Sequence, residues 1–556
     1  MSKGACMLAH TSINHLFSPE EWDPQLSAYE NLRQKNLIPD YVAMIYNNSY
    51  HSLWNVLPYR ETTRFVHKNS LIGVKILEKT VAMMLASTIK KLDVNLHPSI
   101  SHVVNGGLYC RMKVKSITPE FLAEVENKLN ELYGNTRHID IDYKPIGEVV
   151  STLLRQKDKL TADVLARYPL KKINAFQLNE YTFVCDYILA PTSEYFYDLR
   201  VKPYGEGFVV SFEITGNQPR KTYYLGQKKL FEIFSEYSNW TSVVKVDFLA
   251  NLNRSLKSRK IREIIQISET FHEKKLAEIA SAIVDKYPHR RLVLIAGPSS
   301  SGKTTFSKRL SIHLKTYGLH SVPLSLDNYF IDRVKTPRHE NGEYDFENIQ
   351  ALDLDLLNTH LLELLHGKEI ELPEYDFKNG CRSSQTTKMK LKSSDILIVE
   401  GIHGLNEMLT SSIPAPMKYK IYVSAITPLN MDPYNRIGSS DNRLIRRILR
   451  DFKYRGHSAR QSLKMWNSVR LGEEKNIFPF QEEADIMFNS ALIYEWVFLK
   501  KYVAPLLEAV QHSEPEYAEA RRLLTSLCMV DSYDHEEYIP PTSILREFLG
   551  KSSFHY

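Results

Sequence analysis

The feature that most constrains the fold is a loop of glycine and serine between an apolar run and a charged segment. Residues 292–296 are Leu-Val-Leu-Ile-Ala, and residues 297–305 are Gly-Pro-Ser-Ser-Ser-Gly-Lys-Thr-Thr. A strand, the spacing G-x-x-x-x-G-K-T and a helix predicted over 306–317 together are typical of a phosphate-binding loop, or P-loop. The alternative, a chance turn between a strand and a helix, explains neither the lysine nor the threonine.

The P-loop assigns distinct tasks to its residues. Glycines let the backbone approach a phosphate closely, and successive N–H groups with the helix N-terminus favour its negative charge. Lys303 is predicted to reach the β- and γ-phosphates, and Thr304 to bind Mg²⁺. The residues predicted to bind the nucleotide here are Gly297, Ser299, Ser300, Ser301, Gly302, Lys303, Thr304 and Thr305. The sequence therefore predicts a nucleotide-binding protein.

Composition bounds the class of protein. The 556 residues are enough for about three or four domains, and 43% hydrophobic with 24% charged residues is ordinary for a globular chain. A net charge of +6 does not by itself indicate nucleic acid, and five scattered cysteines without a C-x-x-C pair suggest neither disulfides nor zinc. We find no signal-peptide pattern and no apolar run of about 18 residues that would span a membrane. We expect a cytoplasmic enzyme with no membrane partner.

Two acidic residues follow predicted strands downstream of the P-loop. Asp327 comes after the strand predicted over 321–326, and Glu400 after the one over 395–399. Ligands of open α/β sheets lie at the carboxyl ends of strands, so both acids are expected beside the phosphates. Asp327 is predicted to accept the proton of an attacking hydroxyl or to help hold Mg²⁺, and Glu400 to serve Mg²⁺. The alternative for Asp327 is a cap on the next turn.

Short apolar strands alternate with helices through the rest of this half. Further strands are predicted over 419–423 and 485–488, and helices over 352–365 and 494–510. This alternation favours an α/β fold with the doubly wound parallel sheet of P-loop NTPases. The N-terminal half, with helices over 71–85 and 119–132 and β-type runs over 181–212, is predicted to be α+β.

Three polar segments are candidates for the acceptor and for charge neutralisation. The loops 343–347 and 372–377 combine aromatic residues with carboxylates, as a nucleoside pocket requires, although core aromatics with loop acids fit equally. In 441–456, arginines at helical spacing lie opposite leucines and isoleucines. Such a helix would close over a triphosphate as a lid; the alternatives are a solvated surface helix or an RNA-binding face.

Together these motifs resemble the uridine kinase/phosphoribulokinase family over about residues 290–500. The resemblance implies that Asp327 is the general base, that Asp345 binds ribose hydroxyls, and that catalysis uses Lys303. It also implies a base pocket and a set of lid arginines. The substrate residues besides Asp345 are Tyr329, Tyr375 and Phe377, and the lid arginines are Arg447, Arg450 and Arg455, of which Arg447 and Arg450 are assigned to catalysis and Arg455 to the nucleotide.

The chain departs from the pyrimidine-reading positions of uridine–cytidine kinases. Gly380 stands in place of a base-contacting histidine, His457 in place of an arginine, and Met465 in place of a glutamine. Losing partners for a base edge changes specificity by orders of magnitude. The hypothesis is an ATP- or GTP-dependent, Mg²⁺-requiring kinase for the 5′-hydroxyl of a nucleoside. The alternatives are a kinase for a phosphosugar or pantothenate-like acceptor, or an RNA- or amino-acid-binding protein with a nucleotide switch.

The N-terminal half carries a second resemblance, to the editing-type second domain of threonyl-tRNA synthetases. It rests on His97-Pro98-Ser99-Ile100-Ser101-His102, Gly107-Leu108-Tyr109-Cys110 and Leu189-Ala190-Pro191-Thr192-Ser193. Four residues separate the two histidines, where the synthetase pattern has three, so we expect binding or regulation rather than hydrolysis. The predicted domains are a small ubiquitin-like (TGS-like) remnant at 1–70, the editing-like domain at 71–245, a helical connector at 246–288, the kinase-like domain at 289–510 and a helical tail at 511–556. An oligomer is compatible with this organisation.

Overall fold

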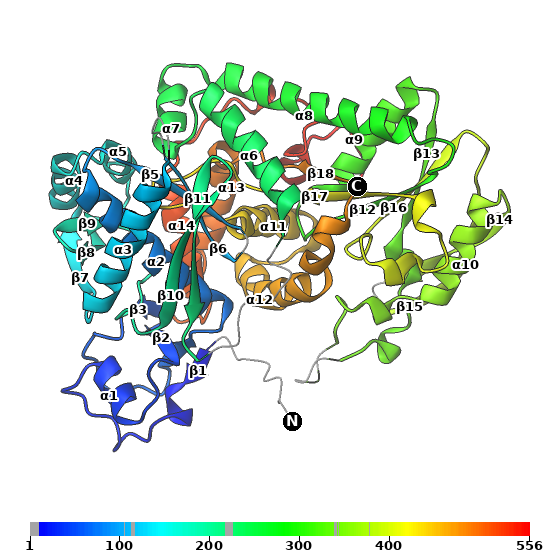
Figure 1. Ribbon diagram of the computed structural model, residues 1–556. Coiled ribbons are helices and arrows are strands. Elements are labelled where there is room, and N and C mark those ends of the chain that lie inside the picture. Colours follow the sequence, from blue (N-terminus) through cyan, green and yellow to red (C-terminus); the bar gives the residue numbers. More distant parts are fainter. Residues whose placement is uncertain are drawn as a thin grey trace.

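A five-stranded parallel sheet forms the centre of the C-terminal half in the computed structural model (Figure 1), which describes residues 10–104, 106–112, 117–216, 226–338, 342, 344–376 and 379–556. The strand order is β13-β16-β12-β17-β18. The strands are β12 (Leu292–Ala296), β13 (His320–Ser325), β16 (Asp395–Glu400), β17 (Lys418–Ser424) and β18 (Ile486–Asn489). All five predicted strands are present, and the strand before the P-loop lies in the middle of the sheet.

Helices cover both faces of this sheet. Along β12, Val293 and Ile295 enter one hydrophobic core, whereas Leu292 and Leu294 enter another, as the two-residue period of a strand requires. Phe306 of α9 packs in the first core and Leu357 of α10 in the second. The helices of this half are α9 (Lys303–Thr316), α10 (Leu354–Leu365), α11 (Ser439–Arg455), α12 (Ala459–Asn476) and α13 (Glu495–Glu508). The doubly wound α/β prediction is confirmed.

An antiparallel hairpin and short 3₁₀ segments complete this half. The hairpin pairs β14 (Glu369–Asp376) with β15 (Cys381–Lys390). The 3₁₀ segments are η3 (Leu326–Tyr329), η4 (Arg333–Lys335), η5 (Ile349–Ala351), η6 (Glu407–Thr410), η7 (Ala415–Met417), η8 (Phe478–Glu483) and η9 (Glu536–Tyr538).

The N-terminal half is α+β, as predicted, with three antiparallel sheets in the described part of the chain. Their orders are β1-β4-β2-β3, β10-β11-β6-β5 and β7-β8-β9. The strands are β1 (His10–Ser12), β2 (Tyr41–Tyr46), β3 (Ser49–His51), β4 (Arg64–His67), β5 (Pro98–Val104), β6 (Gly107–Met112), β7 (Asp140–Pro145), β8 (Lys172–Leu178), β9 (Tyr181–Phe183), β10 (Phe196–Tyr204) and β11 (Gly207–Ile214). The helical elements are η1 (Ile13–His15), α1 (Ala28–Gln34), α2 (Leu71–Leu92), α3 (Pro119–Asn135), α4 (Ile146–Arg155), α5 (Lys159–Leu165) and α6 (Lys228–Val243).

The connector helices belong to the same core as the P-loop sheet. They are α7 (Leu249–Lys257) and α8 (Ile261–Val284), and Figure 1 shows α8 beside α9. Ile265 and Ile279 of α8 are buried with the sheet residues, and Glu273 accepts a hydrogen bond from Arg309 of α9 at 2.8 Å. The predicted connector is therefore packed against the kinase-like region along its apolar side; the predicted domain boundaries stay predictions.

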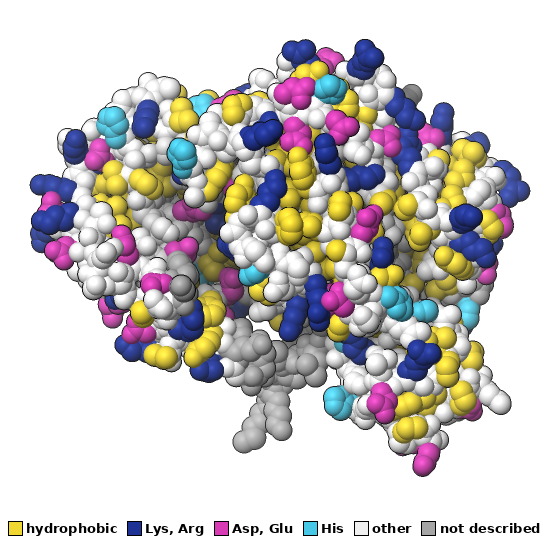
Figure 2. Space-filling model, turned by 180° about the vertical axis from the view of Figure 1, so that it is seen from behind, with side chains coloured by type: hydrophobic (Ala, Val, Ile, Leu, Met, Phe, Trp, Pro, Cys, Tyr) yellow, Lys and Arg dark blue, Asp and Glu magenta, His cyan; other side chains and the backbone are white. Residues whose placement is uncertain are grey.

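The C-terminal tail returns to the P-loop. After α14 (Tyr517–Cys528), the chain forms the short α15 (Arg546–Leu549), and the hydroxyl of Tyr556 then lies 2.8 Å from Oγ1 of Thr305 in α9. Figure 2 shows lysine and arginine side chains interspersed with acidic ones over the opposite face, in keeping with the small net charge. Among the helices described, none is long and apolar enough to cross a membrane.

Candidate active site

The P-loop adopts a backbone that needs its glycines. A Cβ on Gly297 would overlap the carbonyl oxygen of Val423 in β17. Gly302 has φ +81°, a left-handed conformation that glycine adopts without strain, and a Cβ there would lie 2.6 Å from Cγ2 of Ile544. Ser300 also has positive φ, +58°. The loop is thus wound tightly between β12 and α9.

Lys303 lies over its own loop. Its Nζ donates to the carbonyl oxygens of Gly297 at 2.9 Å and Pro298 at 3.3 Å. Burial lowers the pKa of Lys303, and the nearby carboxylate of Glu400 opposes that shift. The ammonium group of Lys303 therefore lies against the backbone of the P-loop.

Thr304 and Glu400 meet at the carboxyl edge of the sheet. The parallel register sets Glu400 beside Ile295 of β12 on one side and Ser325 of β13 on the other. Thr304 Oγ1 donates to Glu400 Oε1 at 2.8 Å. Burial raises the pKa of Glu400, and Lys303 lowers it. The strand register therefore brings the predicted metal residues together.

Asp327 stands at the same edge, in η3 directly after β13. Its side chain reaches solvent, but the protein atoms around it raise its pKa, against the charges of Lys303 and Arg455. The charges of Lys303 and Arg455 lower the pKa of Asp327 because both side chains lie near its carboxylate. Lys303, Thr304, Asp327 and Glu400, which are spread over about a hundred residues of sequence, share one site.

The residues present suit Mg²⁺. A threonine hydroxyl and a carboxylate 2.8 Å apart are hard oxygen donors, which Mg²⁺ prefers. In the described ranges there is no group of three or more His, Cys, Asp or Glu side chains that would hold a metal by itself. This donor set fits an ion that takes its remaining ligands from phosphate oxygens and water.

The lid arginines gather round one buried carboxylate. Asp451 of α11 is fully buried and lies 3.1 Å from Nε of Arg447, 3.5 Å from Nη2 of Arg450 and 3.2 Å from Nη1 of Arg455. Nη1 of Arg447 also donates to Ser299 Oγ at 2.8 Å. Helix α11 is therefore tied directly to the P-loop.

Two further arginines of this helix are paired with buried carboxylates. Arg443 and Arg446 are buried and form ion pairs with Glu473 and Glu495, at 2.8 Å (Nη2 to Oε2) and 2.6 Å (Nε to Oε2). Glu473 also accepts the backbone N–H of Ser299 at 3.0 Å. Buried carboxylates on α12 and α13 thus neutralise Arg443 and Arg446, which are not among the three lid arginines.

The four residues predicted to bind the acceptor differ in where the structure places them. Asp345 is buried and half-buried Tyr375 packs near Phe330, with ring centres 5.6 Å apart. Phe377 lies outside the described residues. Tyr329 is fully buried, and its hydroxyl is 3.0 Å from Nδ1 of His360 in the core under α10. This ring packs in the core, and the assignment of Tyr329 to the substrate stays a prediction.

Two further residues near this site had no role in the sequence analysis. Burial and the charge of Glu473 raise the pKa of Glu347 to about 7, while Arg447 and Lys303 oppose the shift. Burial lowers the pKa of His403 to about 4, opposed by Asp345, and its Nδ1 has no hydrogen-bond partner among the described residues. Glu347 follows Asp345 by two positions in the same loop, which is the signal that was available for it.

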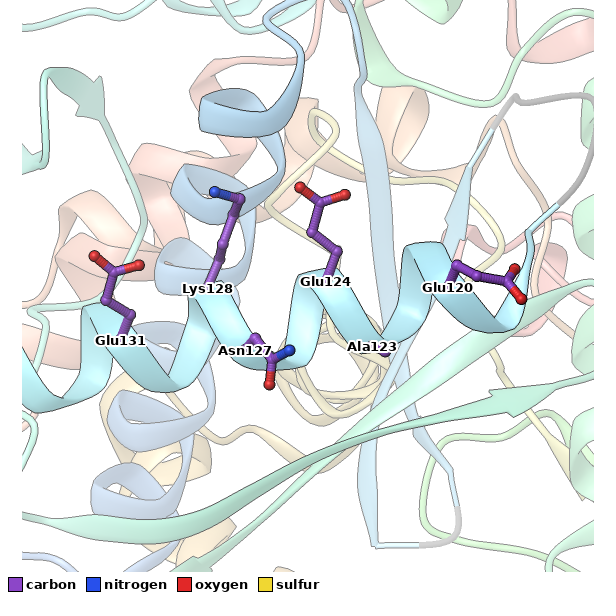
Figure 3. A pocket seen from close by; sticks show the side chains of 6 residues that line it. All are labelled: Glu120, Ala123, Glu124, Asn127, Lys128 and Glu131. Atoms are coloured by element: carbon purple, nitrogen blue, oxygen red, sulfur yellow. The ribbon is translucent and has the colours of Figure 1, made fainter.

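A hollow lies on the outer side of α3 (Figure 3). Glu120, Ala123, Glu124, Asn127, Lys128 and Glu131 line it. These residues all belong to one helix, and their charges project away from it as on a solvated helix face. The chemistry-bearing site is the one at the P-loop.

The fold and the site define a nucleotide-binding α/β protein of the P-loop class. A family model described as the Phosphoribulokinase / Uridine kinase family matches residues 292–493. A uridine kinase of Lactobacillus helveticus is 32% identical over 197 residues, 35% of this chain and 84% of that protein. One of Staphylococcus epidermidis is 33% identical over 198 residues, 35% of this chain and 86% of that protein. The chain belongs to the phosphoribulokinase/uridine kinase family.

Membership makes the C-terminal region that of a kinase for a small substrate. A solved structure from Bacillus stearothermophilus, described as a possible uridine kinase, is 20% identical with a TM-score of 0.27, covering 41% of this chain and all of that one. That likeness is too slight to bear on function. The family match begins at residue 292, so the resemblance of residues 71–212 to a synthetase editing domain stays a prediction.

Proposed function

We propose that this chain transfers the γ-phosphoryl group of ATP to the 5′-hydroxyl of a nucleoside in a Mg²⁺-dependent reaction. The single observation that supports the acceptor class best is the acidic character of the acceptor side. Asp327 lies near Lys303 and Arg455, Glu347 lies near Lys303 and Arg447, and Asp345 lies near Glu347. Carboxylates accept hydrogen bonds from sugar hydroxyls, and they repel an acceptor that already carries a phosphate. A nucleoside fits better than a phosphosugar.

The chemistry follows from six residues. The ionised carboxylate of Asp327 accepts the proton of the acceptor hydroxyl. At the same time the hydroxyl oxygen bonds to the γ-phosphorus, and the bond between that phosphorus and the oxygen of the leaving ADP breaks. Lys303 and the lid arginines Arg447 and Arg450 neutralise charge on the transferring group. Thr304 and Glu400 hold Mg²⁺, which when bound supplies further positive charge at the phosphates. Asp327 must be ionised for its task, so the rise of its pKa by burial matters to the rate.

The acceptor panel tests the proposal. The full chain with Mg²⁺ and ATP is offered nucleosides, phosphosugars and pantothenate, and products are identified by ³¹P NMR. We expect a nucleoside 5′-monophosphate as the main product. Asp355→Asn is the matched control, because Asp355 is an exposed carboxylate on α10 that has no part in the site, and it should turn over like the wild type. Preference for a phosphosugar or pantothenate, or no transfer to any acceptor, contradicts the proposal.

A further inference from the structure

The C-terminal tail contacts the P-loop at a residue assigned to the nucleotide. Oε2 of Glu547 accepts a hydrogen bond from Oγ1 of Thr305 at 2.6 Å. The hydroxyl of Tyr556 lies 2.8 Å from the same Oγ1 of Thr305. Thr305 stands in the first turn of α9, where the helix N-terminus favours a phosphate. Two groups of the tail thus occupy a hydroxyl that the donor nucleotide is expected to use.

Glu547 also faces the other charged groups of the phosphate site. Its carboxylate is close enough to Lys303 and Arg450 to raise the pKa of each against the effect of burial, and it adds to the rise in the pKa of Glu400. A carboxylate presents negative oxygens that accept hydrogen bonds, as a phosphate does. Glu547 therefore lies, in charge and in hydrogen bonding, where a phosphate group would lie.

The tail has an apolar part and a polar part. Ile544, Leu545 and Phe548 are fully buried, so residues 544–549 are part of the core. Residues 551–556 are exposed or half-buried. The polar part is held by Lys308, whose Nζ donates to the His555 carbonyl at 2.5 Å, by the serine hydroxyls that donate to Pro541, and by Tyr556. Polar contacts at a surface exchange readily with water, so this part can leave without unfolding the core.

We propose that Glu547 and residues 551–556 form an autoinhibitory contact, in which the tail occupies the phosphate side of the donor site. A nucleotide binds only when residues 551–556 have left Thr305 and the Glu547 side chain has turned away from it, while the backbone of α15 stays in the core. The inference rests on the proposed function in so far as the donor binds at the P-loop. The apparent dissociation constant of a nucleotide rises in inverse proportion to the fraction of molecules with an open site. The tail thereby sets the affinity for the donor.

Direct binding of MgATP to the full chain, measured by isothermal titration calorimetry, tests the contact. Glu547→Gln keeps the shape of the side chain and removes its charge, and we expect its dissociation constant for MgATP to be about ten-fold lower than that of the wild type. Glu537→Gln is the matched control, since it removes one charge from an exposed glutamate of the same tail, and its affinity should equal that of the wild type. Unchanged or weaker binding by Glu547→Gln overturns the inference.

A second variant guards against a folding defect in the first. Tyr556→Phe loses only a hydroxyl at the chain end, and we expect it to tighten MgATP binding by a smaller factor. Hydrogen exchange of residues 551–556 in the wild type should become faster when MgATP is added. Slower exchange would mean that residues 551–556 help to bind the nucleotide instead of leaving the site. That result overturns the inference.

The outcomes separate the inference from the proposed function. Tighter binding by Glu547→Gln without phosphoryl transfer to any acceptor keeps the autoinhibitory contact and removes the kinase reaction. Phosphoryl transfer with equal affinities in wild type and Glu547→Gln keeps the reaction and removes the contact. If neither protein binds MgATP, the contact has no nucleotide to exclude and the inference fails.

Discussion

The hydroxyl of Thr304 donates a 2.8 Å hydrogen bond to the carboxylate of Glu400, which joins the P-loop to the end of the neighbouring strand β16. The two residues lie 96 positions apart in the chain. They meet because β12 and β16 run parallel in a register that places Ile295 beside Glu400. The same edge of the sheet holds Asp327, so the strand order itself assembles the candidate site.

Glu400→Gln tests this pair. The amide keeps the shape but cannot offer a charged ligand to Mg²⁺, so kcat should fall about 10²- to 10³-fold, or about 3–4 kcal/mol in the barrier. The measurement is kcat as a function of Mg²⁺ concentration, which should also show a higher requirement. Glu508→Gln, at an exposed position on α13, serves as control. A Glu400→Gln protein with the rate and Mg²⁺ dependence of the wild type contradicts the metal assignment.

The buried pair between Arg446 and Glu495 should determine stability. Both side chains are almost fully buried and bond through two contacts, of 2.6 and 3.1 Å. Glu495→Gln leaves the guanidinium charge buried without its counter-ion, which should lower the free energy of unfolding by about 3–5 kcal/mol. Chemical denaturation monitored by circular dichroism measures it. Asp534→Asn, in the exposed pair with Lys501, should change nothing measurable. Equal stability of Glu495→Gln and wild type would disprove the prediction.

The sequence determined much of the fold because its strands are short apolar runs with clear ends. The five strands of the parallel sheet lie within one or two residues of their predicted limits, and Asp327 and Glu400 follow two of them as expected. In such a sheet the position of a residue along the chain decides which edge it reaches. The positions of the P-loop and of the two acids could therefore be predicted from residue types and spacing.

Long-range partners could not be predicted in this way. An aromatic residue beside a predicted catalytic acid suits a pocket as well as a core, and the sequence alone does not show that Tyr329 packs under α10. Arg443 and Arg446 have the spacing of lid residues, yet Glu473 and Glu495 neutralise them from helices distant in the sequence. The contact of Glu547 with Thr305 spans 242 positions and leaves no local pattern.

Acid should inactivate the enzyme at a higher pH than an ordinary aspartate implies. Asp327 acts in its ionised form, and its raised pKa means that this form is lost earlier as the pH falls. Glu347, whose pKa burial raises to about 7, adds a second ionisation on the same side. We therefore expect the acid limb of kcat/KM to move to lower pH in Glu347→Gln. A limb at the same pH in Glu347→Gln and wild type would exclude Glu347 from this ionisation.

Asp345 should control the affinity for the acceptor rather than for the donor. Asp345→Asn replaces a charged acceptor of hydroxyl hydrogen bonds by a neutral one, which costs about 1.5 kcal/mol or more and should raise KM for the nucleoside about ten-fold. The KM for ATP should stay within two-fold, on the order of experimental error. Steady-state kinetics with each substrate varied in turn measures both values. An increase confined to KM for ATP would mean that Asp345 contacts the donor nucleotide and not the acceptor.

Asp327→Asn shows whether Asp327 accepts the proton of the acceptor hydroxyl. The variant is assayed for phosphoryl transfer to the preferred nucleoside and, separately, for MgATP binding by calorimetry. We expect kcat to fall at least about 10²-fold, as for the removal of a general base, with MgATP still bound. Full turnover by an Asp327→Asn protein that binds MgATP would mean that Asp327 is not the general base.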